Sequence, residues 1–150
     1  MKIREGTTAE VDKMFRTVWE PLGWYQEVLS IDRIIPCDMI RVAEVDGKAV
    51  GVIAINTQRP ELTTLFVLPE YERRGIGRAL CEHSIPRVAG DKLIYCDVTT
   101  EAMHKTIQGL SATLQARLDA RLSYEKVGDE YASWREYIAD RLSGDKLDDE

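Results

Sequence analysis

The stretch VLPEYERRGIGRAL, residues 67–80, constrains the fold of this chain more than any other part of it. An apolar run, LTTLFVL, leads into it, and a helical pattern of apolar residues leaves it. The turn between them holds two glycines and three arginines, Gly75, Gly77, Arg73, Arg74 and Arg78. When a strand is followed by a glycine turn and then by the beginning of a helix, the free N–H groups of the helix N-terminus lie at the end of a sheet. We therefore expect an anion such as a phosphate group to bind there.

Two familiar phosphate-binding loops do not fit this string. A P-loop needs four residues between its glycines, followed by Lys-Ser or Lys-Thr. A dinucleotide fingerprint needs a third glycine three residues after the second, where this chain has Leu80. A plain tight turn whose arginine side chains are solvated is the alternative interpretation.

The length and charge of the chain limit the kind of protein that carries this turn. With 150 residues it has the length of one domain, and we expect a single domain over residues 1–142 and a disordered acidic tail over 143–150. No apolar run approaches the roughly 18 residues of a membrane helix, and the N-terminus has no signal-peptide pattern, so we expect a cytoplasmic protein without a membrane partner. The net charge of −6 argues against a nucleic-acid partner.

The three cysteines, Cys37, Cys81 and Cys96, are odd in number and their spacing matches no disulfide framework and no metal site. We expect free thiols in a reducing compartment and no bound metal.

The rest of the pattern predicts strands with interleaved helices. KIRE opens as a strand, and Thr7 with Glu10 has the spacing of a capping box for a helix that ends near Pro21. Two β-rich runs flank Asp46-Gly47, which is a hairpin signal. LTTLFVL and KLIYCDV predict two more strands, residues 100–122 read as mostly helical, and residues 123–138 as one or two closing strands.

Residues 72–77, ERRGIG, resemble the pyrophosphate loop of the GCN5-related N-acetyltransferase (GNAT) superfamily, whose pattern is Gln or Arg, two residues, Gly, one residue, then Gly or Ala. Both glycines match, whereas Glu72 departs from the pattern at the first position. The order of the expected elements follows the superfamily from residue 2 to about 98. The resemblance implies an α/β (α+β) fold, the GNAT-like acyl-CoA N-acyltransferase fold, with a mixed, mostly antiparallel central sheet flanked by helices.

The resemblance also implies acetyl-CoA as a co-substrate, held in a cleft where the fourth and fifth strands splay apart. The pyrophosphate would be held by residues 73–78, which are Arg73, Arg74, Gly75, Ile76, Gly77 and Arg78. A bulge at about Val67 would free its N–H to polarise the thioester carbonyl, and Leu68 would continue the pairing with the pantetheine arm.

For catalysis, the resemblance implies an acyltransferase that moves the acetyl group directly to a primary amine in a ternary complex. The base would be Glu61, eleven residues before Glu72, although a strand-end glutamate of this kind is commonly just a surface residue. The general acid is not established, because the expected tyrosine position falls on Asp119. Tyr124 and Tyr131 are further candidates.

The acceptor stays open between a small amine and a protein amine. Residues of the EPLGWYQE segment and Asp38 are candidates for its pocket, namely Glu20, Trp24, Tyr25 and Glu27. The alternative function is a non-catalytic acetyl-CoA-binding or interaction module with the same fold, motivated by Glu72 and the missing tyrosine. The oligomeric state is open and includes a homodimer.

Overall fold

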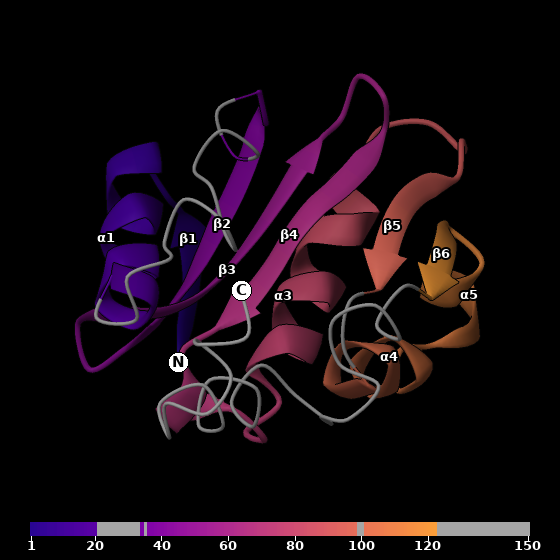
Figure 1. Cartoon of the computed structure of the whole chain (residues 1–150). Helices are drawn as coiled ribbons and strands as arrows, with labels where there is room; N and C mark the ends of the chain where they lie inside the picture. The colour runs from indigo at the N-terminus through magenta and orange to yellow at the C-terminus, as the bar shows by residue number, and fades with distance from the viewer. Residues whose placement is uncertain (21–33, 35, 99–100, 123–150) are drawn as a thin grey trace, which may run out of the picture.

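The computed structural model describes residues 1–20, 34, 36–98 and 101–122 (Figure 1). The strands are β1 Lys2–Glu5, β2 Met39–Val45, β3 Lys48–Asn56, β4 Glu61–Val67, β5 Ile94–Val98 and β6 Leu118–Leu122. The helices are α1 Thr8–Trp19, α3 Ile76–Ser84, α4 Glu101–Gln108 and α5 Ala112–Gln115, with 3-10 turns η3 Pro69–Tyr71 and η4 Ile85–Arg87. The predicted closing strands, the acidic tail, and Trp24, Tyr25, Glu27, Tyr124 and Tyr131 lie outside the described residues.

The described strands form one sheet in the order β1-β2-β3-β4-β5-β6. The neighbours β1 to β4 pair antiparallel, whereas β4 with β5 and β5 with β6 pair parallel. The sheet is therefore mixed and mostly antiparallel, which confirms the predicted fold class. None of the described helices has the length and apolar character needed to cross a lipid bilayer.

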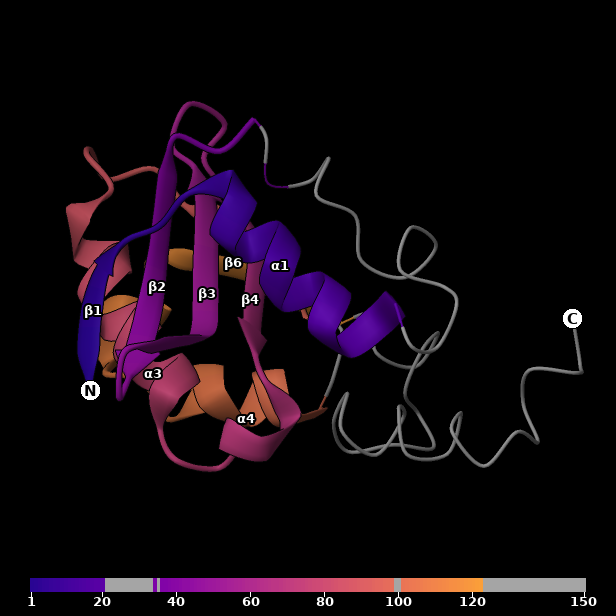
Figure 2. The same cartoon turned by 90° about the vertical axis from the view of Figure 1, so that its left-hand side faces the viewer.

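Helices cover both faces of the sheet (Figures 1 and 2). On the α1 face, the rings of Phe15 and Phe66 meet edge to face with centroids 5.5 Å apart. On the opposite face, Gly51 of β3 lies against Ile76 and Leu80 of α3. The central strand β3 is buried from Val50 to Ile55, since helices pack on both of its sides. The hydrophobic core thus has two layers, and α3 is positioned directly on the strands that lead into the glycine turn.

The local signals at the N-terminal half are confirmed. Thr7 and Glu10 form the reciprocal capping box at the start of α1, which ends at Trp19. Asp46 and Gly47 both have left-handed backbone angles, with φ of 52° and 79°, as a two-residue hairpin turn requires. Because the turn fixes the register of β2 and β3, this hairpin sets the frame on which β4 pairs.

The prediction of a mostly helical segment over residues 100–122 is wrong at its end. Gly109 follows α4, Ser111 caps the short helix α5, and residues 118–122 then form strand β6. Apart from its aspartate, the sequence LDARL consists of good helix formers, but pairing with β5 over five residues overrides that weak preference. The buried residues of α3 are Ile76, Leu80, Cys81 and Ser84, whereas Ala79 and His83 are half-buried.

Candidate functional site

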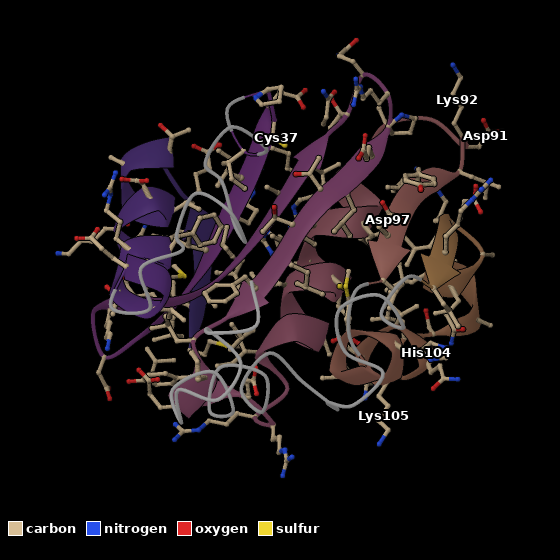
Figure 3. All side chains as sticks on the ribbon, in the orientation of Figure 1. Cys37, Asp91, Lys92, Asp97, His104 and Lys105 are labelled. Atoms are coloured by element: carbon tan, nitrogen blue, oxygen red, sulfur yellow. The ribbon has the colours of Figure 1, made fainter. Side chains whose placement is uncertain are left out.

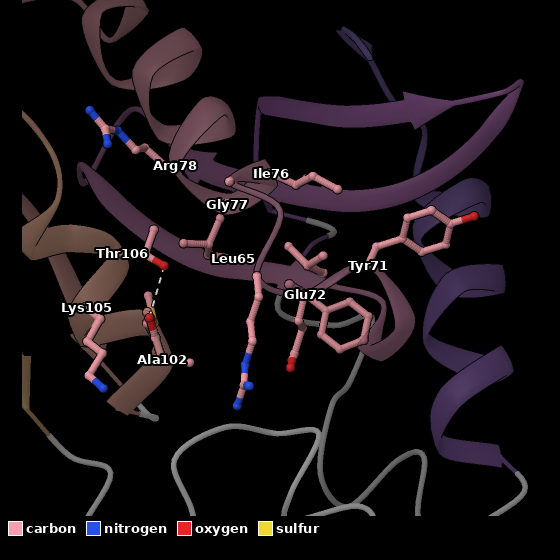
Figure 4. Close-up of a pocket in the computed structure, with 14 residues that line it drawn as sticks. Leu65, Tyr71, Glu72, Ile76, Gly77, Arg78, Ala102, Lys105 and Thr106 are labelled. Carbon is pink, nitrogen blue, oxygen red and sulfur yellow. Dashed lines mark hydrogen bonds between the residues drawn. The ribbon is translucent and has the colours of Figure 1, made fainter.

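A cavity of about 610 Å³ lies beside the predicted phosphate turn (Figure 4). Its walls are the end of β4, the segment from Tyr71 to Arg78, and helix α4. Six residues of the predicted cofactor-binding set line it, Val67, Arg73, Gly75, Ile76, Gly77 and Arg78. Leu68 and Arg74 of that set do not, and neither does the predicted base Glu61. The structure therefore brings the loop residues together around one cavity.

The turn owes its shape to two residues in the left-handed region. Gly75 has φ 78° and precedes the first residue of α3, and Arg73 has φ 66°. For a residue with a Cβ, such as Arg73, this conformation costs about 1–2 kcal/mol. The first helical bond of α3 runs from the Ala79 N–H to the Gly75 carbonyl at 3.0 Å. The N–H groups of residues 76–78 precede it, and they are the groups that helix geometry leaves for an external acceptor.

The two glycines of the turn have different roles. A Cβ on Gly75 would meet nothing within 4 Å, so the positive φ is what demands glycine there. A Cβ on Gly77 would stand 3.6 Å from the Thr106 methyl and 4.0 Å from the Val67 side chain, which are ordinary contacts. Gly77 thus tolerates one added methyl group, but a longer side chain there would enter the cavity.

The three arginines of the turn are also not equivalent. The Arg74 guanidinium lies over the Tyr71 ring at 4.9 Å from the centroid, and the Lys48 ammonium lies 5.7 Å from the same centroid. Arg78 reaches the Glu82 carboxylate at 3.3 Å along α3, and Figure 4 shows it extending away from Glu72. Arg73 lines the cavity from within the loop. Arg74 does not line the cavity itself but contacts Tyr71, which does.

The predicted pantetheine pairing of Leu68 cannot use its N–H, because that group is already bonded within the protein. Its N–H donates to the Val50 carbonyl at 2.8 Å, and its own carbonyl accepts from the Tyr71 N–H at 2.8 Å. The Leu68 side chain is 1% exposed. Leu68 therefore anchors the end of β4 to β3, and its N–H is not available to a ligand.

The bulge in β4 is real, but it lies at Thr63 and not at about Val67. Ala54 pairs with Thr64 while the adjacent Ile55 pairs with Leu62, so Thr63 is the additional residue. The Thr63 hydroxyl lies 3.2 Å from the Cys37 sulfur and 3.4 Å from the Ala54 carbonyl. The sequence resemblance located the bulge by distance from the glycines, and this missed it by four residues.

Beyond the bulge, the alternation of hydrogen-bonded and non-bonded pairs determines which backbone N–H groups of β4 point away from β3. Antiparallel pairs alternate between bonded and non-bonded, and the bond from Leu68 to Val50 makes Phe66 with Val52 the next bonded pair. The N–H groups of Leu65 and Val67 then point away from β3 toward β5. The pairs between β4 and β5 are Glu61 with Tyr95 and Leu62 with Cys96. Leu65 and Val67 lie past those pairs, and both line the cavity.

Glu61 stands at the other end of β4. Its carboxylate accepts from Arg59 at 3.0 Å, and its side chain is 23% exposed. As parallel neighbours, Glu61 and Tyr95 share one face of the sheet, and the Tyr95 hydroxyl donates to Asp97 at 2.8 Å. This hydrogen bond, followed by burial, raises the pKa of Tyr95. Glu61 therefore belongs to a polar group at the start of β4, where β4 pairs with β5. We call this the closed end of β4, and the end beside the cavity its open end.

The remaining candidates lie away from the cavity lining. Asp119 pairs with Tyr95 in the β5–β6 ladder, and Asp38 accepts from the Thr57 N–H at 2.8 Å. The hydrogen bond from the Thr57 hydroxyl, followed by the one from its N–H, lowers the pKa of Asp38. Burial, followed by the charges of Arg87 and Arg41, lowers the pKa of His83. None of these described groups contributes a wall to the cavity.

Sequence reasoning missed the wall formed by α4 and the participation of Leu65. Ala102, Met103, Lys105 and Thr106 line the cavity, about thirty residues after the glycine turn. No local signal connects the two segments, because α4 meets α3 only through the fold. Leu65 had a signal, since it lies two residues before Val67 and shares its strand face.

The family model described as "Acetyltransferase (GNAT) family" matches residues 8–108. The chain belongs to this family. The matched range contains β4, the glycine turn and α3, and it ends with α4. All four elements that build the cavity are thus inside the GNAT match.

The similarity of this chain to individual GNAT proteins covers only part of its length or has low sequence identity. An uncharacterized N-acetyltransferase of Archaeoglobus fulgidus is 37% identical over 72 residues, which is 42% of this chain and 46% of the relative. The chain therefore spans about half the length of that curated relative. An aminoglycoside 6'-acetyltransferase type Ii structure is 20% identical, with 59% of this chain and 64% of that chain covered and a TM-score of 0.46. A Brucella melitensis GNAT acetyltransferase in complex with acetyl-CoA is 21% identical, with coverage of 58% and 67% and a TM-score of 0.44. These likenesses are too distant to carry a substrate over to this chain.

Proposed function

We propose that the chain binds acetyl-CoA in the cavity and transfers the acetyl group directly to a primary amine in a ternary complex. The observation that carries the proposal is the meeting of two kinds of backbone donor at one cavity. The first turn of α3 offers N–H groups to an anion, and the end of β4 offers the N–H groups of Leu65 and Val67. CoA has a pyrophosphate and an amide-containing arm, which suit these two sets of donors.

In this proposal the pyrophosphate binds at the glycine turn, residues 73–78. The amides of Ile76, Gly77 and Arg78, together with the positive end of the α3 dipole, bind its oxygens, and Arg73 adds a charge-assisted contact. Glu72 also lines the cavity and opposes an anion, so the backbone donors must outweigh it.

The arm then runs back along β4. From the phosphorus to the sulfur it has about thirteen bonds, so that it spans roughly 15 Å when extended. Val67 is close to the turn, since its side chain lies 4.0 Å from the Cβ position of Gly77. Leu65 and Thr63 lie roughly 7 and 13 Å further along the strand. We therefore assign Val67 to the pantetheine amides and the Leu65 N–H to the thioester carbonyl, where it would stabilise the developing oxyanion.

In the reaction, a base first takes the proton of the ammonium form, and the resulting free amine attacks the thioester carbonyl carbon. The tetrahedral intermediate expels the CoA thiolate, and the second proton that the nitrogen loses passes through water to that thiolate. Positioning of amine and thioester supplies most of the rate. The proposed base Glu61 is four residues from Leu65, roughly 13 Å along the strand, so the proton would travel through water. The acceptor is a small amine or a protein amine.

A thermal-shift titration followed by a turnover assay tests the proposal. Acetyl-CoA should raise the melting temperature by mass action, and a panel of amines should give CoA release above the water background. No shift at millimolar acetyl-CoA would refute the proposed site. A shift without CoA release for any amine would favour the non-catalytic module, for which the negative charge of Glu72 in the cavity is the supporting observation.

A further inference from the structure

Helix α4 places a cation on the cavity wall that faces the glycine turn. The methyl group of Thr106 lies 3.6 Å from the Cβ position of Gly77, so α4 touches the first turn of α3. The Thr106 hydroxyl donates to the Ala102 carbonyl at 3.0 Å, which holds the side chain against its own helix (Figure 4). Lys105 is the next residue, is exposed, and lines the cavity. Its ammonium stands on a flexible four-carbon stem that starts from this wall of the cavity.

The cations around the cavity divide into two groups by the element that carries them. Arg73 and Arg78 belong to the turn and to α3, and Arg78 is directed at Glu82 with a distance of 3.3 Å. Lys105 approaches from α4, on a different wall (Figure 4). A ligand that filled only the turn would be contacted by the first group. Lys105 is placed for a second negative group of the same ligand.

We propose that Lys105 binds the 3′-phosphate on the ribose of CoA and makes the site prefer CoA to 3′-dephospho-CoA. This inference rests on the proposed function. The pantetheine arm leaves the pyrophosphate along β4 toward Leu65, so the adenosine half leaves in the other direction, toward the open side of the cavity. Among the α4 lining residues, Ala102 and Lys105 are the exposed ones, whereas Met103 and Thr106 are half-buried. Lys105 therefore marks the open side.

The charge of the 3′-phosphate fits this position. A phosphate monoester carries between one and two negative charges at neutral pH, and lysine binds phosphate as a point charge without a fixed geometry. Glu72 lines the cavity as a fixed acidic group of the loop and repels a second phosphate from that side. A phosphate on the α4 side avoids Glu72 and meets the Lys105 ammonium.

The test is a cycle of two ligands and four proteins, with dissociation constants measured by calorimetry at low ionic strength. The ligands are CoA and 3′-dephospho-CoA, and the proteins are the wild type, Lys105→Ala, Lys105→Arg and Lys92→Ala. Lys92 is an exposed lysine before β5 that does not line the cavity, and Figure 3 shows it at the other end of this part of the molecule from Lys105. It controls for the loss of one positive charge.

The wild type should bind CoA about threefold to tenfold more tightly than 3′-dephospho-CoA, which is the size of one exposed charge-assisted contact. Lys105→Ala should bring this ratio close to one by weakening CoA alone. Lys105→Arg and Lys92→Ala should keep the ratio. Equal weakening of both ligands by Lys105→Ala would place the lysine on the pyrophosphate and overturn the inference, as would an unchanged ratio. If the wild type binds neither ligand, the proposed function itself fails.

Discussion

The two ends of β4 have different neighbours. At its start, Leu62 pairs with Ile55 of β3 on one side and with Cys96 of β5 on the other. At its end, Val67 pairs with Gly51 of β3, and its other side opens onto the cavity. The bulge at Thr63 separates the start of β4, which pairs with β5, from the end that borders the cavity. A short parallel pairing therefore suffices to attach β5, and it leaves the rest of the strand edge available for a ligand.

The open end should be the part that binds acetyl-CoA, and Gly77→Asp gives the largest expected effect there. The aspartate places a carboxylate at the proposed pyrophosphate position, and opposing like charges cost several kcal/mol, so affinity should fall at least about a hundredfold. Gly77→Ala is the matched control. Its methyl group makes only ordinary contacts, at 3.6 Å from Thr106, and binding should stay within a few-fold. A folded Gly77→Asp variant with normal affinity in the thermal-shift titration would show that the turn does not hold the pyrophosphate.

The closed end should matter for proton transfer and not for binding, which Glu61→Gln examines. If Glu61 accepts the ammonium proton through water, kcat/KM should drop on the order of a hundredfold at moderate pH. The deficit should shrink as pH approaches the ammonium pKa of about 10, because more of the amine then arrives without its proton. Affinity for acetyl-CoA should not change. A ratio of wild-type to mutant kcat/KM that stays near one across pH would remove Glu61 from the mechanism. The search for the base would then move to Asp97 of β5 or to His104, a half-buried residue of α4 (Figure 3).

The packing of α3 on the open end is testable at Gly51. A Cβ there would lie 3.0 Å from the Ile76 side chain and 3.3 Å from that of Leu80, closer than side chains normally approach. Gly51→Ala should push α3 outward and lower the free energy of unfolding by about 1–3 kcal/mol, measured by denaturant titration. Because Ile76 begins the helix that bears the anion-binding amides, acetyl-CoA affinity should fall too. Unchanged stability and affinity would mean that α3 is not fixed by this contact.

The start of β4, where it pairs with β5, should be closed to solvent, and the titration of Cys96 tests this. Burial raises the pKa of the Cys96 thiol to about 12, with the charges of Asp97 and Glu61 adding to the effect, and burial likewise raises the pKa of Cys81 to about 12. A folded-state pKa above the unfolded value stabilises the fold below about pH 9, and this contribution is lost as pH rises from 9 toward 12. The free energy of unfolding should decline in that window, and less steeply in Cys96→Ala. The same slope in both proteins would contradict the burial of Cys96.

The sequence predicted the parts of the fold and site that depend on local chemistry. Thr7 with Glu10 located α1, Asp46-Gly47 located the hairpin, and the two glycines located the turn that lines the cavity. It did not predict the position of the bulge, because the register between β3 and β4 depends on pairing across the sheet. It did not predict Lys105 for a similar reason, since α4 reaches the turn only by packing on α3. The helix expected at residues 118–122 failed because pairing with β5 outweighed helix propensity.

Residue-resolved hydrogen exchange with and without acetyl-CoA tests the central claim most directly, namely that CoA pairs with the open edge of β4. The N–H groups of Leu65 and Val67 should exchange rapidly in the free protein and become protected in the complex, together with those of Gly77 and Arg78. Phe66, whose N–H faces β3, and Leu62, at the closed end, should be protected in both states. If acetyl-CoA raises the melting temperature while exchange at Leu65 and Val67 does not change, the cofactor binds elsewhere and the account is wrong.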